Sequence, residues 1–312
     1  MSELRFDGRV AIVTGAGGNP GLGRSYAMLL ASRGAKVVVN DLGVGPDGRG
    51  AIGGGPAQVV AEIRAAGGEA IASTESVAER ESAARIIAAA IREWGRLDIL
   101  VNNAGIAPFA LFDEISDADI ERVVGVHLMG HIWMCRAAWS HMAAQGYGRL
   151  VNVSSGVSLS GLPNQPIYSA AKLGVVGLTR ALAAGGGKLG IKANAIMPAA
   201  DTLAWRTMLE PGFSEHARQA GLVPDVVAPV AAWLAHESCP VSGKILQTSA
   251  GAVSEVFFAQ TKGTTPDPDL SLELVSNRMG QILDRSETMS FADPDGVLPP
   301  EMVTRPYATD PR

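Results

Sequence analysis

Three side chains in the middle of the chain have the types and the spacing of an acid–base site. Ser155, Tyr168 and Lys172 bring a hydroxyl, a phenol and an ammonium into one short segment. Residues four apart share a helix face, with about 5–6 Å between Cβ atoms, so Lys172 can lie close to Tyr168. A nearby cation favours the phenolate, so we expect Lys172, together with any cationic ring bound beside it, to lower the pKa of Tyr168 from about 10 toward that of a general base. Such a pair is also compatible with a surface aromatic beside a solvated lysine, so the chemistry depends on what the rest of the chain places nearby.

A glycine-rich turn near the N-terminus is the second chemical feature. An apolar run over 9–14 leads into Gly15, glycines recur through Gly23, a helical pattern follows, and a second apolar run ends at Asp41. In such a βαβ unit the glycines let the backbone approach a pyrophosphate, whose charge is met by the helix N-terminus. A carboxylate after the second strand can accept ribose hydroxyls and repels a 2′-phosphate. The unit therefore predicts NAD rather than NADP, and the alternative is a tight glycine turn without a ligand.

Strand and helix patterns alternate along most of the chain. The expected strands lie near 9–14, 36–40, 69–73, 97–101, 148–153, 190–196 and 244–248. Alternation of this kind predicts an α/β fold, a Rossmann-type doubly wound parallel sheet with its site at the carboxyl ends of the strands. We expect a single NAD-binding domain over 1–258 that includes the catalytic site. The proline-rich segment 259–312 is expected to be a C-terminal extension. It either covers the substrate entrance or the dimer partner, or forms a loosely ordered tail.

Composition limits the remaining possibilities. The 312 residues are 47% hydrophobic and 18% charged, which suits one domain with a substantial core. A net charge of −5 argues against nucleic acid, and no apolar run reaches the length of about 18 residues that spans a bilayer. Two cysteines indicate a reducing compartment rather than a disulfide framework. Since the ends show neither an apolar signal segment nor a peroxisomal address, the cytoplasm is the expected location. No metal site is expected.

Together, the two chemical features resemble the short-chain dehydrogenase/reductase family. The motifs that carry this resemblance are Thr14-Gly15 with the glycine turn, Asp41, Asn102-Asn103-Ala104-Gly105, Ser155, Tyr168, Lys172 and Pro198. Further stretches at 37–43, 126–130, 136–142, 147–149 and 233–239 resemble the (3R)-hydroxyacyl-CoA dehydrogenase domains of type 2 peroxisomal multifunctional enzymes and their bacterial single-domain relatives. The resemblance covers about residues 5–262.

The resemblance implies a role for each matching residue. Tyr168 would be the catalytic acid/base, Lys172 would lower its pKa and bind the nicotinamide ribose, and Ser155 would hold the substrate oxygen. The implied cofactor contacts are Gly15, Gly21, Leu22, Gly23, Asp41, Ser76, Val77, Asn103, Ala104, Gly105, Tyr168, Lys172, Pro198 and Thr202. Thr14 is expected to fix the neighbouring loop rather than touch the cofactor.

The chain departs from the family pattern at three places. The glycine turn is longer than usual, as if Asn19-Pro20 were inserted. His127 stands where many members have an asparagine, and a buried core histidine is the favoured interpretation. Glu75 stands where the subgroup commonly has an aspartate beside the adenine. The loop 43–56, outside these motifs, is interpreted as a surface insertion in preference to a cover near the adenosine.

The predicted activity is the NAD-dependent interconversion of a secondary alcohol and a ketone on a large hydrophobic substrate. A (3R)-3-hydroxyacyl-CoA is favoured; a hydroxysteroid or other hydrophobic alcohol is the alternative, and a non-catalytic NAD-binding scaffold is a third hypothesis. Candidate pocket walls are 106–112, 157–162 and 203–209, and candidate cations for CoA phosphates are Arg206 and Lys262. The family resemblance also implies a homodimer or homotetramer.

Overall fold

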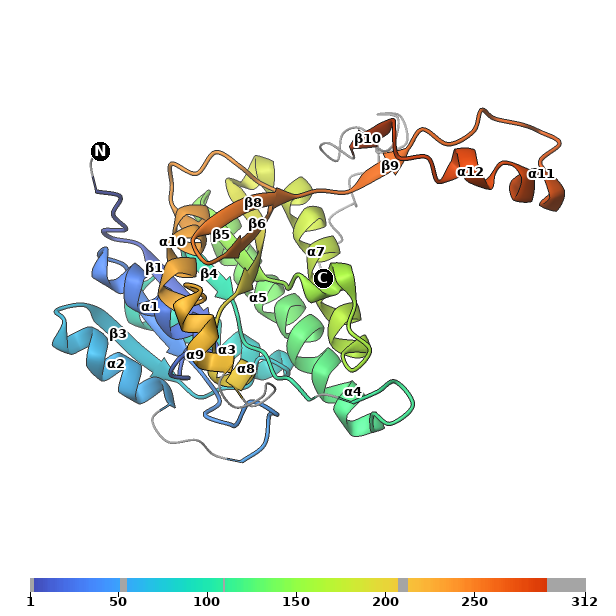
Figure 1. Ribbon diagram of the computed structural model, residues 1–312. Helices are drawn as coiled ribbons and strands as arrows, with labels where there is room; N and C mark the ends of the chain where they lie inside the picture. Colours follow the sequence, from blue (N-terminus) through green and yellow to red (C-terminus); the bar gives the residue numbers. More distant parts are fainter. Residues whose placement is uncertain (1–2, 51–54, 109, 207–212, 291–312) are drawn as a thin grey trace. The chain divides into compact units, whose positions relative to one another are not determined.

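A parallel sheet forms the centre of the molecule. The computed structural model describes residues 3–50, 55–108, 110–206 and 213–290 (Figure 1). Its eight-stranded sheet has the order β3-β2-β1-β4-β5-β6-β7-β8, and every neighbouring pair from β3 to β7 is parallel. The strands are β1 Val10–Thr14, β2 Lys36–Asn40, β3 Glu69–Ser73, β4 Ile99–Asn102, β5 Gly148–Val153, β6 Ile191–Ala199, β7 Ile245–Ser249 and β8 Ala252–Val256. The predicted doubly wound fold is confirmed, whereas β8 was not predicted.

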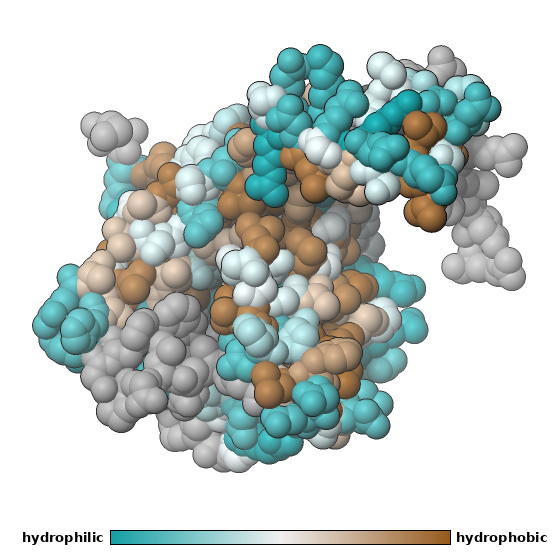
Figure 2. Space-filling view, turned by 45° about the vertical axis from the view of Figure 1, so that its right-hand side comes forward, coloured by the Kyte–Doolittle hydropathy of each residue, from teal (hydrophilic) through white to brown (hydrophobic). Residues whose placement is uncertain are grey.

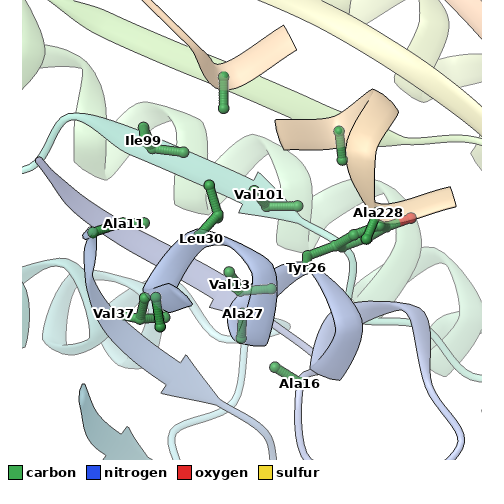
Figure 3. Close-up of a cluster of buried hydrophobic side chains, with 14 of the residues drawn as sticks. Ala11, Val13, Ala16, Tyr26, Ala27, Leu30, Val37, Ile99, Val101 and Ala228 are labelled. Carbon is green, nitrogen blue, oxygen red and sulfur yellow. The ribbon is translucent and has the colours of Figure 1, made fainter. Parts of the chain in front are cut away.

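Helices cover both faces of this sheet because its strands are apolar on both sides. One buried cluster joins Ala11 and Val13 of β1 to helices of one face, and a second cluster contains Val10 and Ile12. Figure 3 shows part of the first cluster, with Leu30 of the first helix among the side chains of the sheet. The helices of the first layer are α1 Leu22–Ser32, α2 Gly55–Ala65 and α10 Pro224–Ala235; those of the second are α3 Arg80–Trp94, α5 Gly130–Gln145 and α7 Pro166–Gly186.

Shorter helices connect these long helices and strands along the chain. They are α4 Asp117–Val124, the π-helix η1 Gly125–Met129, α6 Val157–Ser160, the 3₁₀-helix η2 Gly187–Leu189, α8 Leu203–Arg206 and α9 Phe213–Gln219. The Ser116 side chain caps α4 by accepting from Asp119 N at 3.2 Å. From there α4, η1 and α5 follow one another without a break, so the wider π turn sits inside one long helical segment.

The chain separates into two compact units, Met1–Glu255 and Val256–Arg312. In the second unit, β9 Ala259–Thr261 pairs antiparallel with β10 Thr288–Ser290, and α11 Leu272–Asn277 and α12 Met279–Ile282 lie between them in the sequence. None of the described residues of this unit is buried. The strands of this unit have only three residues each and show no apolar pattern, so the sequence predicts no element there. Residues 291–312 of the expected extension lie outside the described part.

The surface mixes apolar with polar side chains. Figure 2 shows apolar areas between polar ones on one face, and the exposed apolar side chains include Leu111, Phe112, Leu159 and Leu162. Close to these residues in the sequence, Ala110 N donates to Asn164 O at 3.2 Å, so the segment after β4 meets the segment after α6. No helix in the described part of the chain is both long enough and apolar enough to cross a membrane.

Candidate active site

The carboxyl ends of the strands surround a cavity of about 690 Å³. It brings together most of the residues predicted from the sequence: Gly15, Gly21, Leu22, Asp41, Ser76, Val77, Asn103, Ala104, Gly105, Ser155, Tyr168, Lys172, Pro198 and Thr202 all line it. Gly23 does not line the cavity. A Cβ at Gly23 would collide with Gly15 O and Asn103 Nδ2, so its small size serves the packing of α1 against the turn.

The segment after β5 is tied to α7 by two hydrogen bonds. Lys172 Nζ donates to Val153 O at 2.6 Å, and Ser154 Oγ donates to Lys172 O at 2.8 Å. Ser154 thus has a structural role, although it also lines the cavity. Ser155 lines the cavity too, and there its side chain hydrogen-bonds that of Tyr168. The hydroxyl, the phenol and the ammonium therefore meet at one wall of the cavity.

The electrostatics of this wall differ from the sequence-based expectation. Burial raises the pKa of Tyr168 above its usual value, and the hydrogen bond with Ser155 only partly opposes this shift. Burial also lowers the pKa of Lys172, to about 7, because its ammonium has lost water without gaining a carboxylate. Lys172 Nζ lies 5.8 Å from the centre of the Tyr168 ring. In the protein alone, burial therefore dominates and the pKa of Tyr168 is raised. The lowering that the sequence predicts depends on a cationic nicotinamide ring as well as on Lys172.

A buried polar chain holds α7 in register with the sheet. Asn102 Nδ2 of β4 donates to Asn152 Oδ1 of β5 at 2.9 Å, and Asn152 Nδ2 donates to Thr179 Oγ1 of α7 at 2.9 Å. Thr179 in turn donates to Val175 O at 2.7 Å. Because buried polar groups are costly without partners, this chain favours one position of α7 over others. Thr179 lies two turns beyond Lys172 on the same helix face, so this chain also fixes the face of α7 that carries Lys172.

The glycine turn and the segment after β4 are fastened to each other. Thr14 Oγ1 accepts from both Asn103 N and Ala104 N at 3.0 Å, and Asn103 Nδ2 donates to Thr14 O and Gly15 O. Thr14 thus fixes the loop, as expected. Gly15 has φ +64°, and a Cβ there would lie 2.6 Å from Ala104 Cα. Only glycine lets the two loops approach this closely.

The N-terminus of α1 and Asp41 give the cavity the features of a dinucleotide site. Gly21 precedes α1 with no side-chain cap and no acidic residue in the first turn, so the helix N–H groups remain available to an anion. Asp41 Oδ2 accepts from Gly17 N and Asp41 Oδ1 from Gly43 N, each at 2.7 Å. A carboxylate has about four acceptor positions, so Asp41 retains capacity for ribose hydroxyls. These residues fit a nicotinamide dinucleotide with its pyrophosphate at α1.

The interpretation of loop 43–56 as a surface insertion is wrong for its described part. Val44, Gly45 and Pro46 line the cavity. Ala107 N donates to Pro46 O at 2.8 Å, and Arg49 pairs with Asp119 at 3.1 Å, which brings the loop to the segment after β4. Within the loop, Gly45 N donates to Arg49 O and Gly48 N donates to Gly45 O, so the glycines form ordered turns. A glycine-rich composition alone does not distinguish such turns from a flexible loop. Residues 51–54 lie outside the described part.

Other predicted residues have partners that the sequence did not reveal. Glu75 lines the cavity while pairing with Arg85 at 2.8 Å, which lowers the pKa of its carboxyl. Arg206 pairs with Asp201 at 2.7 Å, and Lys262 pairs with Glu287 at 2.7 Å within the second unit. In the expected pocket walls, Phe109 and residues 207–209 lie outside the described part. The described residues contain no group of three or more side chains suited to holding a metal ion.

Comparisons with known proteins agree with this geometry. The family model described as short chain dehydrogenase matches residues 9–203. The chain is 44% identical over 262 residues to the mouse peroxisomal multifunctional enzyme type 2, covering 84% of this chain and 34% of the mouse protein. Among solved structures, the full-length Drosophila melanogaster peroxisomal multifunctional enzyme type 2 is similar with a TM-score of 0.75 and 34% identity, covering 93% of this chain and 48% of that one.

A relative of similar length has the same fold. A short chain dehydrogenase from Mycobacterium avium matches with a TM-score of 0.75 and 38% identity, covering 89% of this chain and 96% of that chain. By contrast, this chain spans about a third of the mouse multifunctional enzyme.

Two buried histidines beside Lys172 predict how stability depends on pH. Burial first, and then the charge of Lys172, lower the pKa of His131 to about 3 and that of His127 well below its usual value. Unfolded histidine takes up a proton near pH 6.5, whereas folded His131 does so only near pH 3. The unfolded state thus binds more protons between these values, and the free energy of unfolding falls as pH falls through this window.

The change His131→Asn should reduce this slope by up to about 1.4 kcal/mol per pH unit, the contribution of one proton. Urea unfolding at several pH values from 6.5 downward would measure it. His141 lies exposed on the same helix, so His141→Asn is the matched control and should leave the slope unchanged. Equal slopes in the wild type and His131→Asn would show that His131 is protonated normally in the fold.

Proposed function

Because the chain belongs to the short-chain dehydrogenase family, and is thus an oxidoreductase acting on CH–OH groups, we propose that it oxidises a (3R)-3-hydroxyacyl-CoA to the ketone with NAD. The observation that carries the proposal is that two sets of residues line one cavity. Ser155, Tyr168 and Lys172 line it together with the glycine turn and Asp41. A hydroxyl substrate held by the first set would therefore lie next to a cofactor held by the second.

The chain's own residues would bind the alcohol and move its proton. The Ser155 hydroxyl and Tyr168 Oη converge on the substrate oxygen, and Tyr168 in its phenolate form accepts the hydroxyl proton as the substrate O–H bond breaks. A nicotinamide cofactor held by the glycine turn and Asp41 would supply the acceptor for the hydride of the carbinol carbon. Lys172, held by Val153 O, supplies positive charge that favours the Tyr168 phenolate. The same groups serve reduction in the reverse direction.

Charge at the adenosine end supports NAD over NADP. Asp41 and Glu75 both line the cavity, whereas Lys172 is the one lysine or arginine among the described lining residues, at the catalytic wall. A 2′-phosphate near Asp41 would meet a carboxylate without a guanidinium or ammonium to offset it. Members of the family use a nicotinamide cofactor, and this charge pattern is what favours the form without the extra phosphate.

The substrate side of the cavity supports a hydrophobic alcohol. Ile106, Val157, Leu162 and Leu203 line it. Because the described lining residues include no further cation, the CoA phosphates would lie outside the cavity while the acyl group enters it. The resemblance to (3R)-hydroxyacyl-CoA dehydrogenases supports the thioester, since apolar walls by themselves also suit a steroid.

A substrate panel tests the proposal directly. Purified protein with NAD should form NADH, followed at 340 nm, from (3R)-3-hydroxyacyl-CoA thioesters of increasing chain length and not from 17β-hydroxysteroids. Turnover of steroids alone would overturn the thioester assignment and leave a hydroxysteroid dehydrogenase. No turnover of any secondary alcohol, with NAD binding confirmed by calorimetry, would leave a non-catalytic NAD-binding protein.

The change Tyr168→Phe should lower kcat by at least about 10²-fold, because it removes the proton acceptor, while NAD affinity stays within about twofold. Steady-state kinetics and calorimetry with NAD would measure the two effects. The control is Tyr147→Phe: the Tyr147 ring lies between Arg9 and Arg149 just before β5, at the opposite end of the strand. Near-normal turnover in Tyr168→Phe would refute the acid/base role.

The change Asp41→Asn should lower the preference for NAD over NADP by about 10–100-fold, since removing the charge relieves about 1.4–2.8 kcal/mol of repulsion with a 2′-phosphate. The amide oxygen can still accept one of the two loop N–H groups. The ratio of kcat/KM for the two cofactors measures the change. Glu69→Gln removes a carboxylate from the opposite end of the neighbouring strand and serves as the control; an unchanged ratio in Asp41→Asn would contradict the assignment.

A further inference from the structure

His127 lies at the centre of the π-helix η1, between α4 and α5. A π turn inside a helix is rare and is often found at functional sites, since it changes the direction in which side chains leave the helix. His127 is 2% exposed and lines the cavity beside Tyr168. Its environment therefore bears on the reaction as well as on the core.

The imidazole ring contacts the catalytic phenol directly. The centres of the His127 and Tyr168 rings are 4.9 Å apart and the ring planes meet at 80°, an edge-to-face arrangement. Such geometry is attractive and restricts the tilt of both rings. Tyr168 is otherwise oriented by its helix and by Ser155, so the imidazole supplies a contact from another direction.

One nitrogen of the same ring holds the wall that leads to the substrate side. His127 Nε2 lies 3.0 Å from Ile106 N and 2.6 Å from Ile106 O, so it accepts from the first or donates to the second according to the tautomer. Nδ1 is buried and has no hydrogen-bond partner in the described part of the chain. At Gly105 an added Cβ would lie 2.7 Å from His127 Cε1, so the preceding glycine makes room for the ring.

The ring can occupy this place because it is neutral. Burial and the charge of Lys172 both lower the pKa of His127 well below its usual value. A protonated ring would face the Lys172 ammonium in a site with little water, whereas a neutral ring packs beside it without repulsion. A carboxylate at this position would instead pair with Lys172 and draw it away from Tyr168.

We propose that His127 is a positioning residue for the reaction: its ring sets the orientation of the Tyr168 phenol, and its Nε2 holds the Ile106 peptide at the substrate wall. This inference rests on the proposed function, in which Tyr168 moves the proton and Ile106 lies beside the substrate. The two roles use different parts of one side chain, so they can be separated by substitution.

Two substitutions separate the roles. His127→Phe retains a ring against Tyr168 and removes the nitrogen, so it should keep kcat within about threefold while raising the substrate KM at least about fivefold. His127→Gln retains a group able to hydrogen-bond Ile106 and removes the ring, so it should lower kcat at least about tenfold, because a misplaced catalytic group is costly, and change KM less than twofold. His131→Asn removes a neighbouring buried imidazole with no ring contact to Tyr168 and should leave both constants within about twofold.

A spectroscopic measurement tests the same idea without turnover. The chain has four tyrosines, and with 3-fluorotyrosine incorporated the ¹⁹F signal of Tyr168 is the one lost in Tyr168→Phe. Removing the adjacent ring in His127→Gln should move this signal, whereas His127→Phe should move it less. Hydrogen exchange at the Ile106 amide should be faster in His127→Phe than in His127→Gln.

The outcomes distinguish this inference from the proposed function. Wild-type protein without turnover of any alcohol would refute the proposed function, while the ¹⁹F signal would still decide whether His127 orients Tyr168. An unmoved ¹⁹F signal and a kcat within twofold in His127→Gln would refute the positioning role. Equal losses of kcat in both His127 variants and in His131→Asn, or failure of both His127 variants to fold, would show that the histidine serves the core alone.

Discussion

The site depends on an ammonium buried without a carboxylate. Lys172 is 2% exposed, and its Nζ donates to a backbone carbonyl, Val153 O, at 2.6 Å. Taking a charge out of water is costly, and a carbonyl dipole offsets only part of that cost, which is why the pKa of Lys172 falls to about 7. The surroundings stabilise this placement: Ser154 anchors the backbone of the same residue, and the chain from Asn102 through Asn152 to Thr179 fixes the helix one to two turns further on.

The parallel sheet explains how groups far apart in the sequence line one cavity together with this ammonium. In such a sheet every carboxyl end lies at the same edge, so the segments that leave the strands there share one space. The glycine turn follows β1, Asp41 follows β2, Asn103 follows β4 and Ser155 lies two residues beyond β5. Thr14 and Asn103 then fasten the first and third of these segments together. A single backbone arrangement thus places the acid–base group within reach of a site suited to a dinucleotide.

The sequence predicts those features of the site that depend on residues close together along the chain, and not those that depend on contacts between distant segments. Apolar runs revealed each strand from β1 to β7, and the interval from Tyr168 to Lys172 indicated a shared helix face, because both patterns reflect backbone geometry. The raised pKa of Tyr168 was not predictable, since it depends on burial by segments distant in the sequence. The loop before α2 was misinterpreted for the same reason: its partners, Ala107 and Asp119, lie far along the chain. The sequence predicts Gly23 as a cofactor contact, whereas in the structure its lack of a side chain lets α1 pack against the glycine turn.

The distribution of charge along the cavity follows from the same burial. Asp41 and Glu75 line one end, and the ammonium of Lys172 lies at the other, with the uncapped N-terminus of α1 among the lining residues as well. The groups packed near the ammonium are uncharged, because burial keeps both neighbouring imidazoles neutral. An acidic residue in either place would form an ion pair and remove the positive charge from the phenol's surroundings. A neutral imidazole fills the same space and forms hydrogen bonds or ring contacts without forming an ion pair. The positive charge of Lys172 therefore remains available to the groups that line the cavity.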